Sequence, residues 1–147
     1  MLKEEAVIKV INMNEDRLKH SYSVGKKMME LGKEKNLCKE EIEDLFVLGL
    51  NHDIGYEVDS TGRNHNKIGG KILKRNGYKY WKEVYYHGEK QDEYNSLYLK
   101  ILNSADMQID KFGNDVGFEK RLEDIKSRYG EKSEVYHKCV ELIDSIK

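Results

Sequence analysis

The sequence contains no proline and only two cysteines in 147 residues. Proline is the residue that most strongly interrupts helices, so its absence favours a helical protein. Cys38 and Cys139 lie far apart and match no metal-ligand spacing. This argues against a disulfide framework or a zinc motif and favours reduced thiols in a cytoplasmic protein.

The sequence also lacks an excess of charge of either sign and any long apolar run. Its 26 Lys and Arg residues nearly balance its 27 Asp and Glu residues, so no overall basic field indicates a nucleic-acid partner. The first residues carry scattered charges, which excludes a signal peptide or a membrane span there. We therefore expect a soluble cytoplasmic protein without a nucleic-acid or membrane partner, either a monomer or a homodimer.

What the sequence does contain is apolar residues at helical spacing among many charges. Charged residues make up 36% of the chain and hydrophobic residues 38%. We predict an all-α fold in a single domain over residues 1–147, with a core over about 14–110 and C-terminal helices over 118–146 packed on it. The expected helices are 2–11, 14–31 with Asn14 as N-cap, 39–52, 65–75, 78–86, 92–109, 118–129 and 132–147.

A histidine and an aspartate stand side by side where the most apolar expected helix meets a glycine. Gly49 would let another backbone or helix come close to this helix, and His52 and Asp53 follow it before Gly55. A lone pair of this kind is more often a plain helix end, with Gly55 as its cap. The functional interpretation therefore depends on polar residues elsewhere in the chain.

Four other segments each supply one histidine or aspartate that is directed inward or stands at a helix end. His20 continues the apolar stripe of its helix, and Asp106 adjoins the apolar residue Ala105. His65 opens one expected helix, and His87 finishes another. A buried carboxylate needs an arginine, a hydrogen-bond network or a metal. The six candidate residues include four of the five histidines of the chain.

This mixture of imidazoles and carboxylates suits an intermediate divalent cation, iron first, with manganese, zinc, nickel or magnesium as alternatives. Six ligands exceed one structural site. They would hold two cations that share a carboxylate and would leave positions for water and substrate, an arrangement used for hydrolytic phosphoryl chemistry.

The ordered series resembles the HD-domain superfamily of metal-dependent phosphohydrolases. The matching stretches are Arg17-Leu18-Lys19-His20, Asn51-His52-Asp53-Ile54-Gly55, Asn64-His65-Asn66-Lys67-Ile68-Gly69 and Ser104-Ala105-Asp106. The resemblance implies an all-α helical bundle. It implies that the first metal is bound by His20, His52, Asp53 and Asp106, and that His65 and His87 form the additional pair of binuclear members, with Asp53 as the bridge.

Within the superfamily, the small bacterial branch that cleaves dinucleoside tetraphosphates symmetrically is the most similar, with the same order of six ligands. The extension after its last aspartate usually contains Pro and Arg, whereas here Met107 to Lys111 follow Asp106. The cyclic-dinucleotide phosphodiesterases are excluded because they carry Lys at the place of Tyr56 and a proline signature that this chain lacks.

The resemblance implies an enzyme that hydrolyses a small phosphorylated substrate, first a nucleotide, with a metal-activated hydroxide. We expect Asp53 to hold both metals and Glu89 to donate a proton to the leaving group. Arg17, Arg63 and Lys90 are the basic residues nearest to the ligands in sequence, and we expect them to bind phosphate. Two alternatives stay open: a di-iron oxygenase, which the superfamily also contains, and a non-catalytic nucleotide-binding regulatory module.

Overall fold

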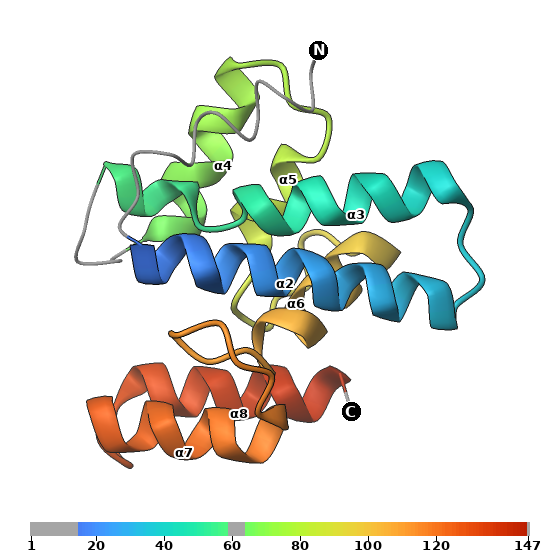
Figure 1. The fold of residues 1–147 in the computed structure, drawn as a ribbon. Coiled ribbons are helices and arrows are strands. Elements are labelled where there is room, and N and C mark those ends of the chain that lie inside the picture. The colour runs from blue at the N-terminus through green and yellow to red at the C-terminus, as the bar shows by residue number, and fades with distance from the viewer. Residues whose placement is uncertain (1–14, 59–63, 147) are drawn as a thin grey trace.

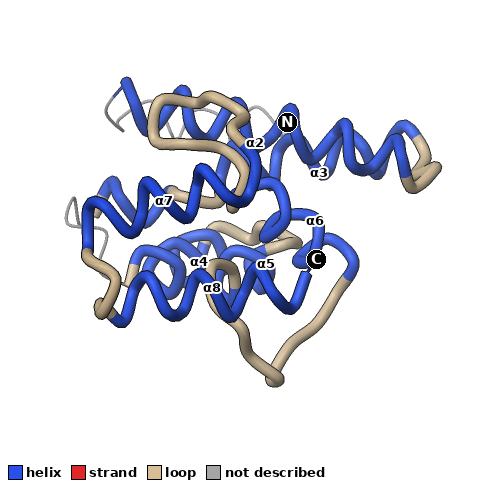
Figure 2. The backbone as a smooth tube through the Cα atoms, turned by 90° about the horizontal axis from the view of Figure 1, so that it is seen from below, coloured by secondary structure: helices blue, strands red, loops and turns tan. Residues whose placement is uncertain are grey.

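The structure, a computed structural model, describes residues 15–58 and 64–146, and of Glu57 the backbone alone. Seven α-helices and one short 3-10 helix make up the regular elements of these residues (Figures 1 and 2). No β-strand occurs among them beyond an isolated bridge between Ile109 and Asp115. The predicted all-α fold is confirmed. The expected helix over 2–11 and the N-cap at Asn14 lie outside the described residues.

The first two helices form an antiparallel pair in the middle of the molecule. These are α2 (Glu15–Glu34) and α3 (Lys39–Asn51), which run in opposite directions beside each other (Figure 1). Acidic residues stand in the first turn of each helix, where the helix dipole favours them. The backbone N–H of Cys38 donates to Glu41 Oε1 at 3.0 Å, which defines the start of α3.

Three shorter helices and one 3-10 turn pack around this pair. They are η2 (Ile54–Glu57), α4 (His65–Arg75), α5 (Trp81–Tyr86) and α6 (Leu97–Asp106). The apolar core lies between these helices and the α2–α3 pair, with fully buried side chains such as Met28, Leu48 and Leu102. The C-terminal helices α7 (Gly117–Tyr129) and α8 (Glu134–Ile146) pack on each other and enclose a second, smaller core around Ile143 (Figure 1).

Two of the expected helices start at least three residues later than the sequence indicates. Residues 78–80 are not helical, and α5 begins only at Trp81. Residues 92–96 are not helical, because the Gln91 side chain accepts the backbone N–H groups of Glu93 at 2.8 Å and Tyr94 at 2.9 Å. Ser96 then caps α6 by accepting the N–H of Leu99 at 3.0 Å.

The end of α6 is also earlier than expected, because the chain turns after Asp106 instead of continuing to Ile109. Asp110 accepts the backbone N–H groups of Phe112 and Asn114, each at 2.9 Å, and so stabilises the turn. Within the described residues, no helix has the length and apolar character needed to cross a bilayer.

Candidate metal centre

Six polar side chains from five helices converge at one place between α2, α3 and α6. Only His20, on α2, comes from the interior of a helix. His52 and Asp53 follow the last residue of α3, His65 begins α4, His87 follows α5, and Asp106 ends α6. Five of the six residues are buried, and the side chain of His65 is 26% exposed. The segments that carry these residues are far apart in the sequence, and they meet because the helix ends point at a common centre.

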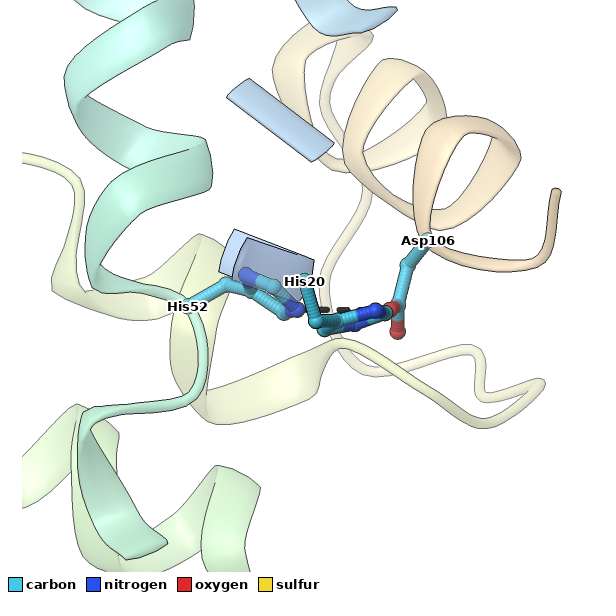
Figure 3. A group of neighbouring side chains, drawn as sticks. All are labelled: His20, His52 and Asp106. Carbon is cyan, nitrogen blue, oxygen red and sulfur yellow. Dashed lines mark hydrogen bonds and ion pairs between the residues drawn. The ribbon is translucent and has the colours of Figure 1, made fainter. Parts of the chain in front are cut away.

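One group consists of His20, His52 and Asp106, whose side chains point toward one another (Figure 3). Nε2 of His20 lies 2.9 Å from Asp106 Oδ1, and Nε2 of His52 lies 3.2 Å from the same oxygen. The two imidazole rings are 5.3 Å apart. Donor atoms at these separations are close enough to bind one cation together.

Backbone carbonyls fix the orientation of three of the imidazoles. Nδ1 of His20 lies 2.9 Å from the carbonyl of Asp110, while Nδ1 of His52 and Nδ1 of His87 each lie 2.6 Å from a carbonyl, of Gly49 and Val84 respectively. A carbonyl oxygen can only accept, so each Nδ1 carries the proton. In a neutral ring, Nε2 then carries no proton, and its lone pair is directed at the carboxylates. An imidazole nitrogen and a carboxylate oxygen that both accept can face each other favourably only with a cation or a proton between them.

The two oxygens of Asp53 face different histidine pairs. Oδ2 lies 3.6 Å from His20 Nε2 and 3.3 Å from His52 Nε2. Oδ1 lies 3.4 Å from His65 Nε2 and 3.7 Å from His87 Nε2. One carboxylate therefore stands between two sets of imidazole donors, which is the position that a bridging ligand would occupy.

The electrostatics of the centre demand positive charge. Burial opposes a charged His52, but Asp53 and Asp106 outweigh it and raise the pKa of His52 to about 9. Burial would raise the pKa of Asp53, yet the surrounding histidines, His52 foremost, hold it well below its usual range. The pKa of Asp106 is likewise held low, by His52 and His20, against the effect of burial. The carboxylates are therefore ionised and attract a proton or a metal ion.

A second, independent observation also supports a bound metal ion at these residues. Nε2 of His87 is buried and has no hydrogen-bond partner among the described residues, with Asp53 Oδ1 as its nearest carboxylate at 3.7 Å. A buried polar atom without a partner costs free energy. A cation held by His52, Asp53 and His87, whose ligand atoms lie within 4.8 Å of one another, would satisfy it, and His65 Nε2, 3.4 Å from Asp53 Oδ1, could add a further ligand. The mixed nitrogen and oxygen donor set suits the divalent transition metals.

Arg17 and Tyr56 border the ligands. Arg17 Nη1 lies 3.5 Å from Asp53 Oδ2, and its guanidinium carbon is 3.7 Å from the centroid of the Tyr56 ring. The ring of His65 also lies beside the Tyr56 ring, with centroids 4.8 Å apart. Burial, followed by Asp53, raises the pKa of the Tyr56 hydroxyl, so this group stays protonated. Tyr56 was not predicted as a site residue from the sequence, because it begins a stretch with the composition of a loop.

The other site residues predicted from the sequence lie in different places. Glu89 lines the same pocket as the ligands, with its carboxylate 3.6 Å from Lys67 Nζ. Lys90 is exposed and lines a different cavity, so the structure does not bring it to the ligands. Lys67, which the sequence did not single out, takes the place near Glu89 instead. Arg63 lies outside the described residues.

The fold and these ligands together define an all-helical protein with a buried histidine–carboxylate centre suited to divalent cations. Comparison with known families identifies the class: the sequence model of the HD domain matches residues 17–147. The chain belongs to the HD-domain family, whose members are typically metal-dependent phosphohydrolases. No curated protein and no solved structure gave a significant match to the chain.

Proposed function

We propose that this protein is a binuclear metal-dependent phosphohydrolase that acts on a small phosphate ester or anhydride, first of all a nucleotide. The observation that carries the proposal is the division of the Asp53 carboxylate between two histidine pairs. His20, His52 and Asp106 would hold one cation with Asp53, and His65 and His87 would hold the other. When bound, such cations acidify water and neutralise charge on a phosphoryl group.

The pocket beside the ligands favours an anionic substrate. It has a volume of about 600 Å³ and is lined by six basic and four acidic residues, in a chain whose overall charge is −1. An excess of basic residues in a pocket raises the local concentration of anions. Apolar residues line it as well, and Tyr129 and Val135 leave 53% and 44% of their surface exposed. This combination supports a substrate with both phosphate and an apolar or aromatic part, as in a nucleotide.

Within the pocket, Arg17 would contact the phosphoryl oxygens from beside Asp53, and Glu89 would supply the proton to the leaving group. Lys67 Nζ at 3.6 Å and Lys138 Nζ at 4.0 Å both face the Glu89 carboxylate. A Glu89→Gln variant should lower kcat and change its pH profile while leaving the metal content unchanged.

Elemental analysis of protein purified without chelator tests the proposal directly. We expect about two equivalents of divalent metal per chain and phosphatase activity that EDTA removes and metal restores. One equivalent in the purified protein, unchanged after metal addition, would contradict the binuclear site. Assays of iron-loaded protein with and without oxygen separate hydrolysis from oxidation, because only oxidation would need oxygen.

The Asp53→Ala variant is the matched test of the bridge. It should lose both metal equivalents and turnover together, because Asp53 faces both histidine pairs. Asp144→Ala removes an acid that is exposed on α8 and serves as the control. Retained metal-dependent phosphatase activity in Asp53→Ala would overturn the proposal.

A further inference from the structure

Arg121, on α7, reaches into the pocket of the metal centre from the C-terminal helices. Its Nε–H donates to the backbone carbonyl of Asp106 at 3.5 Å, so the guanidinium lies beside a residue of the centre itself. The side chain is only 11% exposed. Arg121 is thus placed where a substrate bound at the centre would meet it.

One terminal nitrogen of Arg121 lacks a hydrogen-bond acceptor. Nη1 is buried and has no hydrogen-bond partner among the described residues, and its ion pair with Asp124 Oδ2 spans 3.7 Å, too far for a hydrogen bond. An unsatisfied donor on a buried charged group is costly, so such a donor usually has an acceptor in the functional state. Among the described residues, Arg121 makes no ion pair with the carboxylates of Asp53 and Asp106, and histidines contact both oxygens of Asp53 and Oδ1 of Asp106.

The neighbours of Arg121 hold it in this position. Asp124, on the same helix, lies between Arg121 and Arg128, and its Oδ2 accepts from Arg128 Nη2 at 2.9 Å. Both arginines line the pocket. One carboxylate therefore orients two guanidinium groups on one helix, and the planar donor fork of arginine matches the oxygens of a phosphate.

We propose that Arg121 is a substrate-binding residue, which donates Nη1–H to a phosphate oxygen of the substrate, with Asp124 as the residue that positions it. The inference rests on the proposed function, because it assigns the anion to the same pocket. It gives the C-terminal helices a part in the site: α7 supplies a phosphate-binding arginine that stands after all six metal ligands in the chain.

Titration calorimetry with inorganic phosphate tests the inference on the metal-loaded protein without turnover. Arg121→Met should weaken phosphate binding at least tenfold, which corresponds to about 1.4 kcal/mol. Arg121→Lys should keep part of the affinity, because it retains the charge and loses the fork. Arg75→Gln removes an exposed arginine on α4 and should bind phosphate as the unmodified protein does. All variants should keep the metal content, because Arg121 is not a ligand.

The thermal midpoint distinguishes binding from a structural role. Arg121→Met removes the unsatisfied Nη1 donor together with the 3.5 Å hydrogen bond from Nε–H to the Asp106 carbonyl, so its midpoint without phosphate should stay close to that of the unmodified protein. Phosphate should raise the midpoint of the unmodified protein and not that of Arg121→Met, whereas a merely structural arginine would lower the midpoint without phosphate and leave the rise with phosphate unchanged. If Arg121→Met does not fold, Arg121→Lys still decides: affinity and KM equal to those of Arg75→Gln would overturn the inference. Phosphate binding that depends on Arg121 in a protein without hydrolytic activity would instead support the inference and contradict the proposed function.

Discussion

Gly49 lies directly against the backbone of Gly25, where α3 crosses α2. A Cβ atom on Gly49 would meet the Cα and N atoms of Gly25, and it would stand 3.1 Å from Met28 Sδ. Because the obstacle is backbone, it cannot rotate away. On α3, the contact lies about one helical turn before His52, which follows the end of that helix. On α2, it lies five residues after His20. The contact therefore sets the separation of these two ligands.

Gly49→Ala should therefore destabilise the protein, because overpacked cores typically lose about 1–3 kcal/mol. The helix propensity gained by alanine, about 1 kcal/mol, would offset only part of this loss. Urea unfolding measures the change. As a control, Gly77→Ala alters a turn where an added Cβ meets nothing within 4 Å, although its φ of 75° adds strain of its own. A Gly49→Ala variant as stable as the unmodified protein would contradict the role of this contact.

The sequence predicted that Gly49 permits a close approach, but it could not identify Gly25 as the partner. A glycine marks where space is needed, whereas the partner depends on how two helices cross. The ligands were predictable for a related reason. His52, Asp53, His65 and His87 stand at helix ends, and His20 continues an apolar stripe, so local patterns already place them toward the interior.

The residues around the ligands were less predictable, because distance along the chain is a poor guide to distance in space. Lys90 is three residues from His87 and faces another cavity, whereas Lys67 lies 3.6 Å from Glu89. Arg121 follows the last ligand by 15 residues. Because 36% of the residues are charged, the composition of the chain does not distinguish Arg121 from a surface arginine.

His65 offers a test of the two-cation arrangement. Its Nε2 lies 3.4 Å from Asp53 Oδ1, and its side chain is 26% exposed, so its removal should leave the group of His20, His52 and Asp106 in place. We expect His65→Ala to retain about one of two metal equivalents and a thermal midpoint close to that of the unmodified protein in EDTA. His20→Ala should lose the equivalent on the other side. Elemental analysis measures the metal content. Variants that each hold as much metal as the unmodified protein would argue against both assignments.

The metal-free protein should become less stable between pH 7 and pH 9.5. The pKa of His52 is raised to about 9 in the folded protein from an ordinary value of 6.5. Its proton therefore stabilises the fold fully below pH 6.5, and this contribution is lost as the pH rises through 9. The contribution is on the order of 3 kcal/mol. Thermal unfolding in EDTA at pH 6.5 and 9.5 measures it, and a midpoint that stays level or rises would contradict it.

Metal binding should show the opposite dependence on pH. A cation replaces the proton at His52 Nε2, so binding releases protons and becomes tighter as the pH increases from 6 to 8. Competition with a chelator of known affinity at the two pH values measures this change. An affinity independent of pH would indicate that His52 does not bind the metal.

Glu83 holds the segment that connects His87 to α6, and its replacement should loosen that segment. The carboxylate is 3% exposed and accepts hydrogen bonds from Tyr94 Oη and Ser96 Oγ, each at 2.7 Å. Ser96 also caps α6, the helix that carries Asp106 at its other end.

Replacing Glu83 by Gln removes the charge from both hydrogen bonds, and hydrogen bonds to charged groups contribute about 1.5–3 kcal/mol each. We expect Glu83→Gln to lower the free energy of unfolding by about 2 kcal/mol, and Glu83→Leu to lower it further, because both hydroxyls would then lack their acceptor. The exposed Glu93→Gln is the control. Hydrogen exchange should quicken in residues 88–96 of Glu83→Gln before it does so in α2. Uniform quickening throughout the chain would show instead that Glu83 acts only on global stability.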